Sequence, residues 1–141
     1  PGIVGFGKAV DLSEISQYAP VKELRDFLIQ EILTIPDVQL NGSRENRISN
    51  NANFAFNYIE GESLLLHLDS KGICISTASA CASHSLEPSH VLKAIGLTPE
   101  IAHGSIRFSL SKHTTKQEIE ECVKYIKESV EELRKISTLV K

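Results

Sequence analysis

Cys81 lies in a stretch of small and polar residues, from Ser76 to His90, in which the apolar residues follow neither a helical nor a strand period. Free cysteine usually behaves as a small buried hydrophobe, so a cysteine in a polar loop is more typical of chemistry than of packing. Downstream, Arg107 lies between Ile106 and Phe108 in an alternating segment, which predicts a strand with the arginine on its polar face. A loop thiol and a guanidinium on a strand together predict a site for a small carboxylate.

Arg107 also has a purely structural interpretation, which is an ion pair with one of the 18 acidic residues. From the residues alone this interpretation stays open beside a role in binding, and the polar-face placement decides for binding only together with the family resemblance described below. Asn51 and Asn53 could line the same cleft, but side-chain amides on strands more often hydrogen-bond to backbone edges, so neither is included in the predicted site.

Cys81 could bind zinc together with histidines, since zinc accepts thiolate and imidazole ligands. His84, His90 and His103 are unevenly spaced around a single cysteine, which is a weak metal pattern, so no metal site is predicted. The role of His84 stays open between tuning the thiol and being a solvated loop residue.

The other two cysteines are interpreted as packing residues. Cys74 alternates with Ile73 and Ile75 in a predicted strand, and Cys122 lies next to the apolar stripe of the last predicted helix. Three cysteines in unrelated settings do not make a disulfide framework and favour a reducing compartment. We therefore expect a cytoplasmic protein.

The cysteine and arginine segments together resemble a known family. The run STASACASHSLEPSHVLKAIG, followed by HGSIRFSL and a helix that begins at a threonine, is similar to the carboxy-terminal part of the cysteine desulfurases that supply sulfur for iron–sulfur clusters. The resemblance extends from near Pro1 to the last helix, and it is to the subgroup with a long catalytic loop. Ala78 and Ser49 stand where the family often has glycine and proline, which concerns local backbone geometry and not the chemistry.

This resemblance implies a fold and a mechanism. Residues 1–141 are expected to be the small domain of a homodimeric fold-type I transferase that uses pyridoxal phosphate (PLP). Such an enzyme converts L-cysteine to L-alanine and passes the sulfur to an iron–sulfur scaffold protein or another acceptor. Cys81 matches the nucleophile that becomes a persulfide, and Arg107 matches the arginine that binds the substrate carboxylate.

The cofactor site itself is not expected in this chain. In the family, the lysine that holds PLP lies upstream in a large domain, which nothing here matches, and Lys8 is interpreted as a solvated lysine. The chain contains no methionine, which suggests a domain of a longer enzyme that is inactive alone. The alternative is a non-enzymatic sulfur-relay or interaction module with a reactive loop cysteine, and an assay with L-cysteine and PLP would distinguish the two.

Composition and periodicity indicate one globular domain. The chain is 41% hydrophobic and 23% charged, and its net charge of -3 provides no electrostatic reason to expect nucleic-acid binding. It has no apolar run of membrane-spanning length. The pattern predicts a two-layer α+β domain with a mixed sheet packed with helices. The expected helices are 5–33 with a break or kink at Pro20, 62–69, 88–96 and one from Thr115 onward, where Thr115 lies three residues before Glu118 in a capping-box pattern. The expected strands are 38–40, 51–58, 73–77 and one around Arg107.

Overall fold

The structure, a computed structural model, describes residues 1–77 and 88–138 of the 141-residue chain. The helices are α1 (Gly2–Asp11), the 3-10 helix η1 (Ile15–Gln17), α2 (Tyr18–Ile32), α3 (Gly61–Asp69), α4 (His90–Ala94), α5 (Pro99–His103) and α6 (Lys116–Ile136). The strands are β1 (Val38–Leu40), β2 (Asn51–Phe56), β3 (Ser76–Thr77) and β4 (Ser105–Ser109).

The four strands form one sheet in the order β1-β2-β4-β3, and all three neighbouring pairs in the described part of the chain are antiparallel. The prediction of a mixed sheet was therefore wrong. Alternation of apolar and polar residues indicates where a strand lies and which face it buries, but not its direction. Direction depends on how the helical connections return the chain to the sheet, and periodicity carries no information about that.

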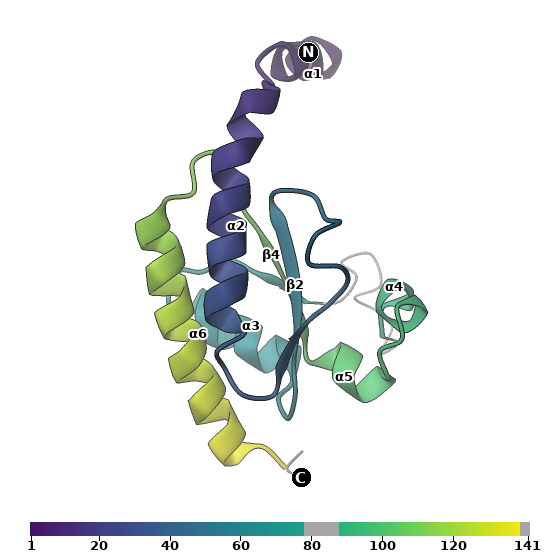
Figure 1. The fold of residues 1–141 in the computed structure, drawn as a ribbon, viewed down its shortest axis with the longest axis vertical. Helices are drawn as coiled ribbons and strands as arrows, with labels where there is room; N and C mark the ends of the chain where they lie inside the picture. The colour runs from purple at the N-terminus through teal and green to yellow at the C-terminus, as the bar shows by residue number, and fades with distance from the viewer. Residues whose placement is uncertain (78–87, 139–141) are drawn as a thin grey trace.

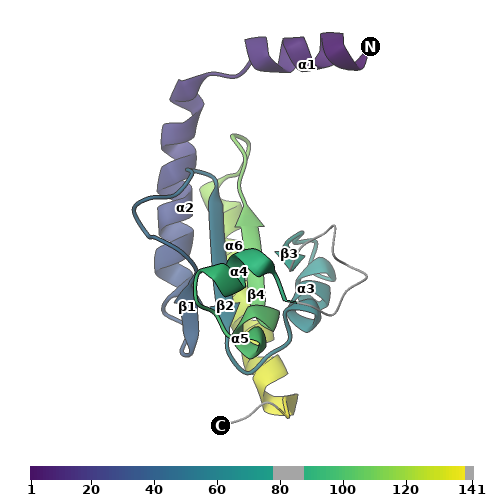
Figure 2. The same cartoon turned by 90° about the vertical axis from the view of Figure 1, so that its right-hand side faces the viewer.

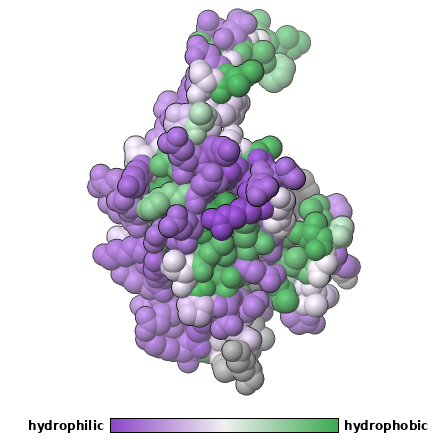
Figure 3. All heavy atoms as spheres, in the orientation of Figure 1, coloured by the Kyte–Doolittle hydropathy of each residue, from purple (hydrophilic) through white to green (hydrophobic). Residues whose placement is uncertain are grey.

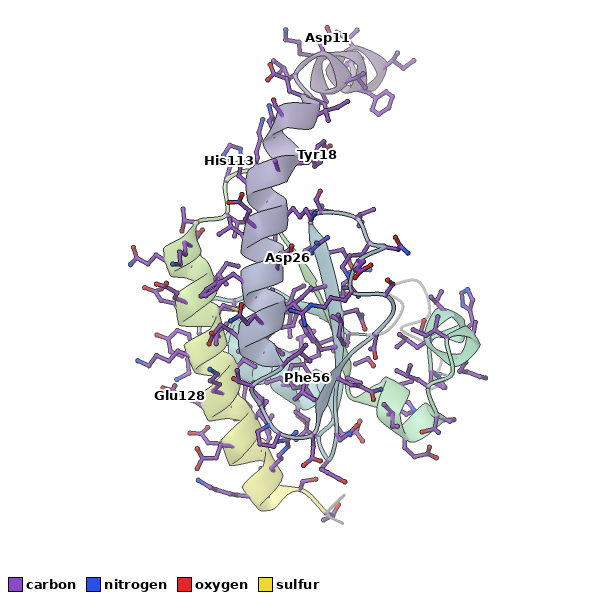
Figure 4. All side chains as sticks on the ribbon, in the orientation of Figure 1. Asp11, Tyr18, Asp26, Phe56, His113 and Glu128 are labelled. Atoms are coloured by element: carbon purple, nitrogen blue, oxygen red, sulfur yellow. The ribbon has the colours of Figure 1, made fainter. Side chains whose placement is uncertain are left out.

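Three helices, α2, α3 and α6, cover one face of the sheet (Figure 1). Between them and the sheet lies a single hydrophobic core, in which the Phe54 and Phe108 rings meet edge to face with their centroids 5.9 Å apart. Figure 4 shows Phe56 inside this layer, between the sheet and the helices. This arrangement confirms the predicted two-layer α+β architecture. The fully buried core side chains include Leu28, Ile29, Ile32, Phe54, Leu64, Leu68, Ile106 and Ile126.

The opposite face of the sheet is covered only in part. Helices α4 and α5 lie in front of it when the molecule is viewed from that side (Figure 2). Gly104 joins α5 to β4, and its carbonyl accepts a 2.9 Å hydrogen bond from the Phe56 amide. A Cβ atom at Gly104 would collide with the Phe56 carbonyl oxygen, so this close approach of two backbones requires glycine.

The helical break in the first third of the chain does not lie at Pro20, where it was predicted. Helix α1 ends at Asp11 and α2 begins at Tyr18, so Pro20 lies in the first turn of α2. Proline is tolerated there because the first amides of a helix have no intrahelical partner. The chain turns instead at residues 12–17, and α1 projects away from the body of the domain (Figure 2).

Apolar side chains gather on the surface of α1 and over α4 (Figure 3). Every residue of α1 is exposed, and the exposed fractions of Ile3 and Phe6 are 90% and 72%. No helix among the described residues combines the length and the apolar composition needed to cross a membrane.

Helix α6 begins with the capping box predicted from Thr115 and Glu118. The Thr115 hydroxyl accepts from the Glu118 amide at 3.2 Å, and the Glu118 carboxylate accepts from the Thr115 amide at 2.7 Å. Hydrogen bonds from the Thr115 backbone and hydroxyl lower the pKa of Glu118. Because the folded pKa lies below the unfolded one, the stabilisation by this carboxylate is present above the unfolded pKa and is lost as the pH falls through the folded pKa.

Replacing the cap should destabilise the domain measurably. We expect Thr115→Ala to lower the free energy of unfolding by about 1 kcal/mol, because one amide at the start of α6 loses its acceptor. Urea denaturation followed by circular dichroism measures this change. Thr138→Ala, which removes an exposed hydroxyl beyond the end of the same helix, should leave the midpoint unchanged. Equal midpoints for Thr115→Ala and the unsubstituted protein would show that the cap does not stabilise α6.

Candidate functional site

Arg107 lies at the centre of β4, on the side of the sheet away from the hydrophobic core. Its neighbours Ile106 and Phe108 are buried, at 0% and 4% exposure, whereas Arg107 is exposed, which confirms the predicted alternation. Within residues 1–77 and 88–138, the Arg107 side chain makes no hydrogen bond or ion pair. The described part of the chain therefore provides no carboxylate that occupies this guanidinium.

The neighbouring strands place further polar residues around Arg107. Asn53 of β2 and Ser76 of β3 are its partners on either side, and Asn51 pairs with Ser109 two positions along the ladder, on the same face. Side chains directly opposite each other on antiparallel strands have Cβ atoms about 4.5–5.5 Å apart. We call these five residues, Asn51, Asn53, Ser76, Arg107 and Ser109, the Arg107 face. They provide hydrogen-bond donors around one exposed cation.

Cys81 and His84 lie outside the described residues. The structure does describe where their segment starts: β3 ends at Thr77, which pairs with Ile106, next to Arg107. Cys81 lies four positions after Thr77 in the sequence, and four fully extended steps of the chain span at most about 14 Å. Chain connectivity therefore limits how far Cys81 can lie from the strand that carries Arg107.

The other two thiols differ from each other in environment. Cys122 on α6 is buried, as predicted, and desolvation raises its pKa to about 11. Cys74 is exposed, so the prediction that it packs in a strand was wrong. The ladder of β3 covers only Ser76 and Thr77, and residues 73–75 form no strand, so no pleat directs the Cys74 side chain inward.

Two arginines that the sequence analysis did not single out hold the connection between β1 and β2. Arg25 on α2 is 2% exposed and donates from Nη1 to the Ile48 carbonyl at 2.8 Å and from Nη2 to Asp26 Oδ1 at 2.6 Å. Arg47 donates from Nη2 to the Asn41 carbonyl at 2.8 Å. Burial and the nearby Arg25 charge lower the pKa of Arg47. Figure 4 shows Asp26 on α2, from which this network starts.

One signal in the sequence could have identified Arg25. It lies four residues after Val21 and three before Leu28, within the apolar stripe of α2. A charged residue on the buried face of a helix must be hydrogen-bonded, which indicates a structural role. The network positions β2 and therefore one side of the Arg107 face.

Comparison with known proteins places this fold in a family. Residues 1–122 match the aminotransferase class-V family, and the chain belongs to that family. Its sequence is 51% identical over 140 residues to the cysteine desulfurase IscS of Dictyoglomus turgidum, and 45% identical over 140 residues to the cysteine desulfurase IscS of Haemophilus influenzae. These matches cover 96% and 97% of this chain but 36% and 34% of the relatives. The chain thus spans about a third of the length of the curated relatives it matches.

Solved structures agree with the fold. A NifS-like protein superposes with a TM-score of 0.72 at 28% identity, covering 84% of this chain and 29% of that one. The NifS-like protein of Rickettsia africae superposes with a TM-score of 0.70 at 26% identity, covering 81% of this chain and 29% of that one. Escherichia coli cysteine desulfurase CsdA reaches 0.66 at 15% identity, over 89% and 28% of the chains, which shows a common fold.

The family is PLP-dependent, but the described residues do not fit the cofactor. None of the described lysines lies on a strand of the sheet, and Lys8 is exposed on the projecting helix α1. A PLP enzyme needs a lysine for the cofactor aldehyde and a partner for its ring nitrogen. The Arg107 face provides neither, so no step through PLP can be assigned to these residues.

Among residues 1–77 and 88–138, no three histidine, cysteine or acidic side chains are grouped as metal ligands.

A cavity of about 620 Å³ lies between the end of α2 and α6, where it is lined by Ile35, Pro36, Val130 and Arg134 among others. No residue of the Arg107 face lines it. The geometry of the cation and its neighbouring donors, rather than this cavity, defines the candidate site.

The different environments of Cys74 and Cys122 should be visible in their reactivity. In a Cys81→Ser protein at pH 8, we expect iodoacetamide to alkylate Cys74 at least ten times faster than Cys122. The reason is that Cys122 is buried and only about one in a thousand of its thiols is ionised at that pH. Peptide mass spectrometry of samples taken at several reaction times measures both alkylation rates. In urea, which unfolds the protein, the two rates should become similar. Equal rates in the folded protein would contradict the burial of Cys122.

Proposed function

We propose that this chain is part of a PLP-dependent cysteine desulfurase that converts L-cysteine to L-alanine and forms a persulfide on Cys81. One observation carries the proposal: Arg107 is held exposed and without a partner among the described residues, on the strand beside the one that leads to Cys81. Its relatives in sequence are cysteine desulfurases, which favours this substrate among those of the class-V family.

Arg107 binds the carboxylate of the substrate. Its planar guanidinium offers two parallel N–H donors that match the two oxygens of a carboxylate. The ladder on both sides of β4 holds the backbone of Arg107, and the burial of Ile106 and Phe108 prevents the strand from rotating. The substrate is therefore oriented by a rigid element rather than by a loop.

Cys81 receives the sulfur. Its thiolate attacks the substrate sulfur, an S–S bond forms, and the bond between the substrate sulfur and its Cβ atom breaks. The Cβ atom takes the electron pair and a proton to become the methyl group of alanine, while both sulfurs are oxidised to the persulfide level, so no external oxidant is needed. An ordinary thiol, with a pKa of about 8.5, is only partly ionised at neutral pH, so the complete site must favour the thiolate.

The remainder of the enzyme supplies what this chain lacks. PLP, bound outside this chain, would activate the substrate bond that breaks. The complete enzyme is a homodimer in the cytoplasm, and the persulfide sulfur passes to an iron–sulfur scaffold protein or another sulfur acceptor. Without the cofactor lysine, the 141-residue chain alone releases no sulfide from L-cysteine.

The carboxylate role of Arg107 can be tested by a conservative substitution. In the complete enzyme, we expect Arg107→Lys to lower kcat/KM for L-cysteine by one to two decades, or about 1.5–3 kcal/mol, because lysine cannot donate two parallel hydrogen bonds. Steady-state alanine formation measures the effect.

The control for this substitution is Arg44→Lys, because Arg44 is exposed and has no interaction with the described residues. Arg134 is unsuitable, since it donates to the backbone carbonyls of Pro36, Asp37 and Asn57. Equal kinetics for Arg107→Lys and Arg44→Lys would remove Arg107 from the site.

The nucleophile is tested by locating the persulfide. After incubation of the complete enzyme with L-cysteine, we expect the Cys81 peptide to be heavier by one sulfur atom, while Cys74 and Cys122 peptides stay unmodified. Cys81→Ser should abolish the adduct without changing cofactor absorbance or the melting temperature. A persulfide on Cys74 or Cys122, or sulfide release at the full rate by Cys81→Ser, would show that Cys81 is not the nucleophile.

A further inference from the structure

We propose that Asn53 is a second donor to the substrate carboxylate beside Arg107, and that Asn41 is the residue that positions its amide. This inference rests on the proposed function, because it concerns the same ligand. It adds a binding residue on β2 that the sequence analysis had left out of the site.

The register places Asn53 where such a donor is needed. Asn53 lies directly opposite Arg107 in the β2–β4 ladder, and its flanking residues Ala52 and Phe54 are buried in the core, at 1% and 0% exposure. Asn53 is therefore on the same face of the sheet as Arg107, with Cβ atoms expected at about 4.5–5.5 Å. Its side chain is half-buried, which leaves part of the amide open to a ligand.

A short hydrogen bond determines which way the Asn53 amide points. Asn41 donates from Nδ2 to Asn53 Oδ1 at 2.6 Å. The oxygen of Asn53 therefore faces Asn41, and its NH2 group faces the other way. Within the described part of the chain, that NH2 group donates to no other residue. It remains available as a donor on the Arg107 face.

The orientation of Asn41 is in turn set by Ser105. Asn41 Nδ2 lies 3.2 Å from Ser105 Oγ, and that hydroxyl donates its own proton to the Ile101 carbonyl at 3.4 Å. Since the hydroxyl has used its proton, it must accept from its other neighbour, so the NH2 group of Asn41, and not its oxygen, faces Ser105. An amide flip at Asn41 would break this bond and the one to Asn53.

Asn41 is itself held firmly. It is 7% exposed, its backbone amide donates to the Asn53 carbonyl at 2.8 Å, and its own carbonyl accepts from Arg47 at 2.8 Å. In this orientation its side-chain oxygen is buried without a partner among the described residues. Native proteins contain few such atoms, and each calls for a reason. Here the orientation of the Asn41 amide has two consequences. It leaves the oxygen of Asn41 unpaired, and it makes the NH2 group of Asn53 face the ligand.

The two donors suit one carboxylate. A carboxylate offers about four lone-pair positions, and a bidentate guanidinium uses two of them. The Asn53 amide can approach a third from the neighbouring strand. Asn46 is exposed in the connection between β1 and β2, where its side chain makes no hydrogen bond with the described residues, so it provides a control amide outside the Arg107 face.

The test measures ligand affinity in the complete enzyme with Cys81→Ser, so that the substrate is not consumed. Binding of L-cysteine and of cysteamine, which lacks the carboxylate, is followed through the absorbance of the bound cofactor. We expect Asn53→Ala to weaken L-cysteine binding about ten-fold or more and to leave cysteamine binding within two-fold. Asn46→Ala should change the binding of neither ligand, because Asn46 lies outside the Arg107 face. Asn41→Ala should also weaken the binding of L-cysteine but not that of cysteamine. Its melting temperature is compared with that of the Asn53→Ala protein, to separate a loss of stability from a loss of binding.

Arg107→Lys separates this inference from the function on which it rests. If Arg107→Lys weakens L-cysteine binding but Asn53→Ala does not, the role of Asn53 is wrong and the proposed function stands. Equal weakening of both ligands by Asn53→Ala would also overturn the inference, because it would indicate a general structural defect. If Arg107→Lys does not discriminate between L-cysteine and cysteamine, the carboxylate site itself is wrong.

Discussion

The antiparallel pairing of β2 with β4 is the interaction on which the rest of the structure depends. It carries Phe54, Ile106 and Phe108 into the hydrophobic core, and by the same alternation it directs Asn53 and Arg107 to the opposite face. A slip of one residue would exchange the two sets and force a guanidinium into the core, which is why the buried face specifies the register so strongly. The geometry of the candidate site is therefore a consequence of how the core is packed.

The arginines of this chain show how environment separates a structural cation from one that can bind a ligand. Arg25 is almost completely buried, but a carbonyl oxygen and the Asp26 carboxylate satisfy its donors. Arg134 is likewise engaged by three backbone carbonyls. Arg107 has no such partner among the described residues, although its backbone is held on both sides by neighbouring strands. A rigid backbone with unsatisfied donors is what a carboxylate site requires.

Two of the thiols are separated by environment in the same way. Cys122 is buried, and the loss of hydration keeps it protonated far above neutral pH. Cys74 is exposed, but it lies outside the strand ladder, two residues before β3 begins. Exposure alone therefore does not identify a nucleophile. The proposal for Cys81 depends on its sequence context and on the strand from which its segment starts.

Several features of this protein followed from the sequence alone. Alternation around Arg107 predicted the strand and its polar face, and the spacing of Thr115 and Glu118 predicted the start of α6. These predictions succeeded because they depend on interactions within one segment. The family could also be identified from the residues around Cys81 and Arg107, because the matching run is long and its residues occur in the same order as in the family.

Only the tertiary structure decided what depends on contacts between distant segments. Strand direction and the exposure of Cys74 were predicted wrongly, because each is determined by how the chain returns to the sheet. The break before α2 was misplaced because Pro20 is accommodated in the first turn of that helix. The bond from Asn41 to Asn53 joins residues on different strands, and the bond from Asn41 to Ser105 spans 64 positions of the chain. Periodicity can place an asparagine on a face of a strand. The direction in which its amide points is determined by partners that the fold brings together.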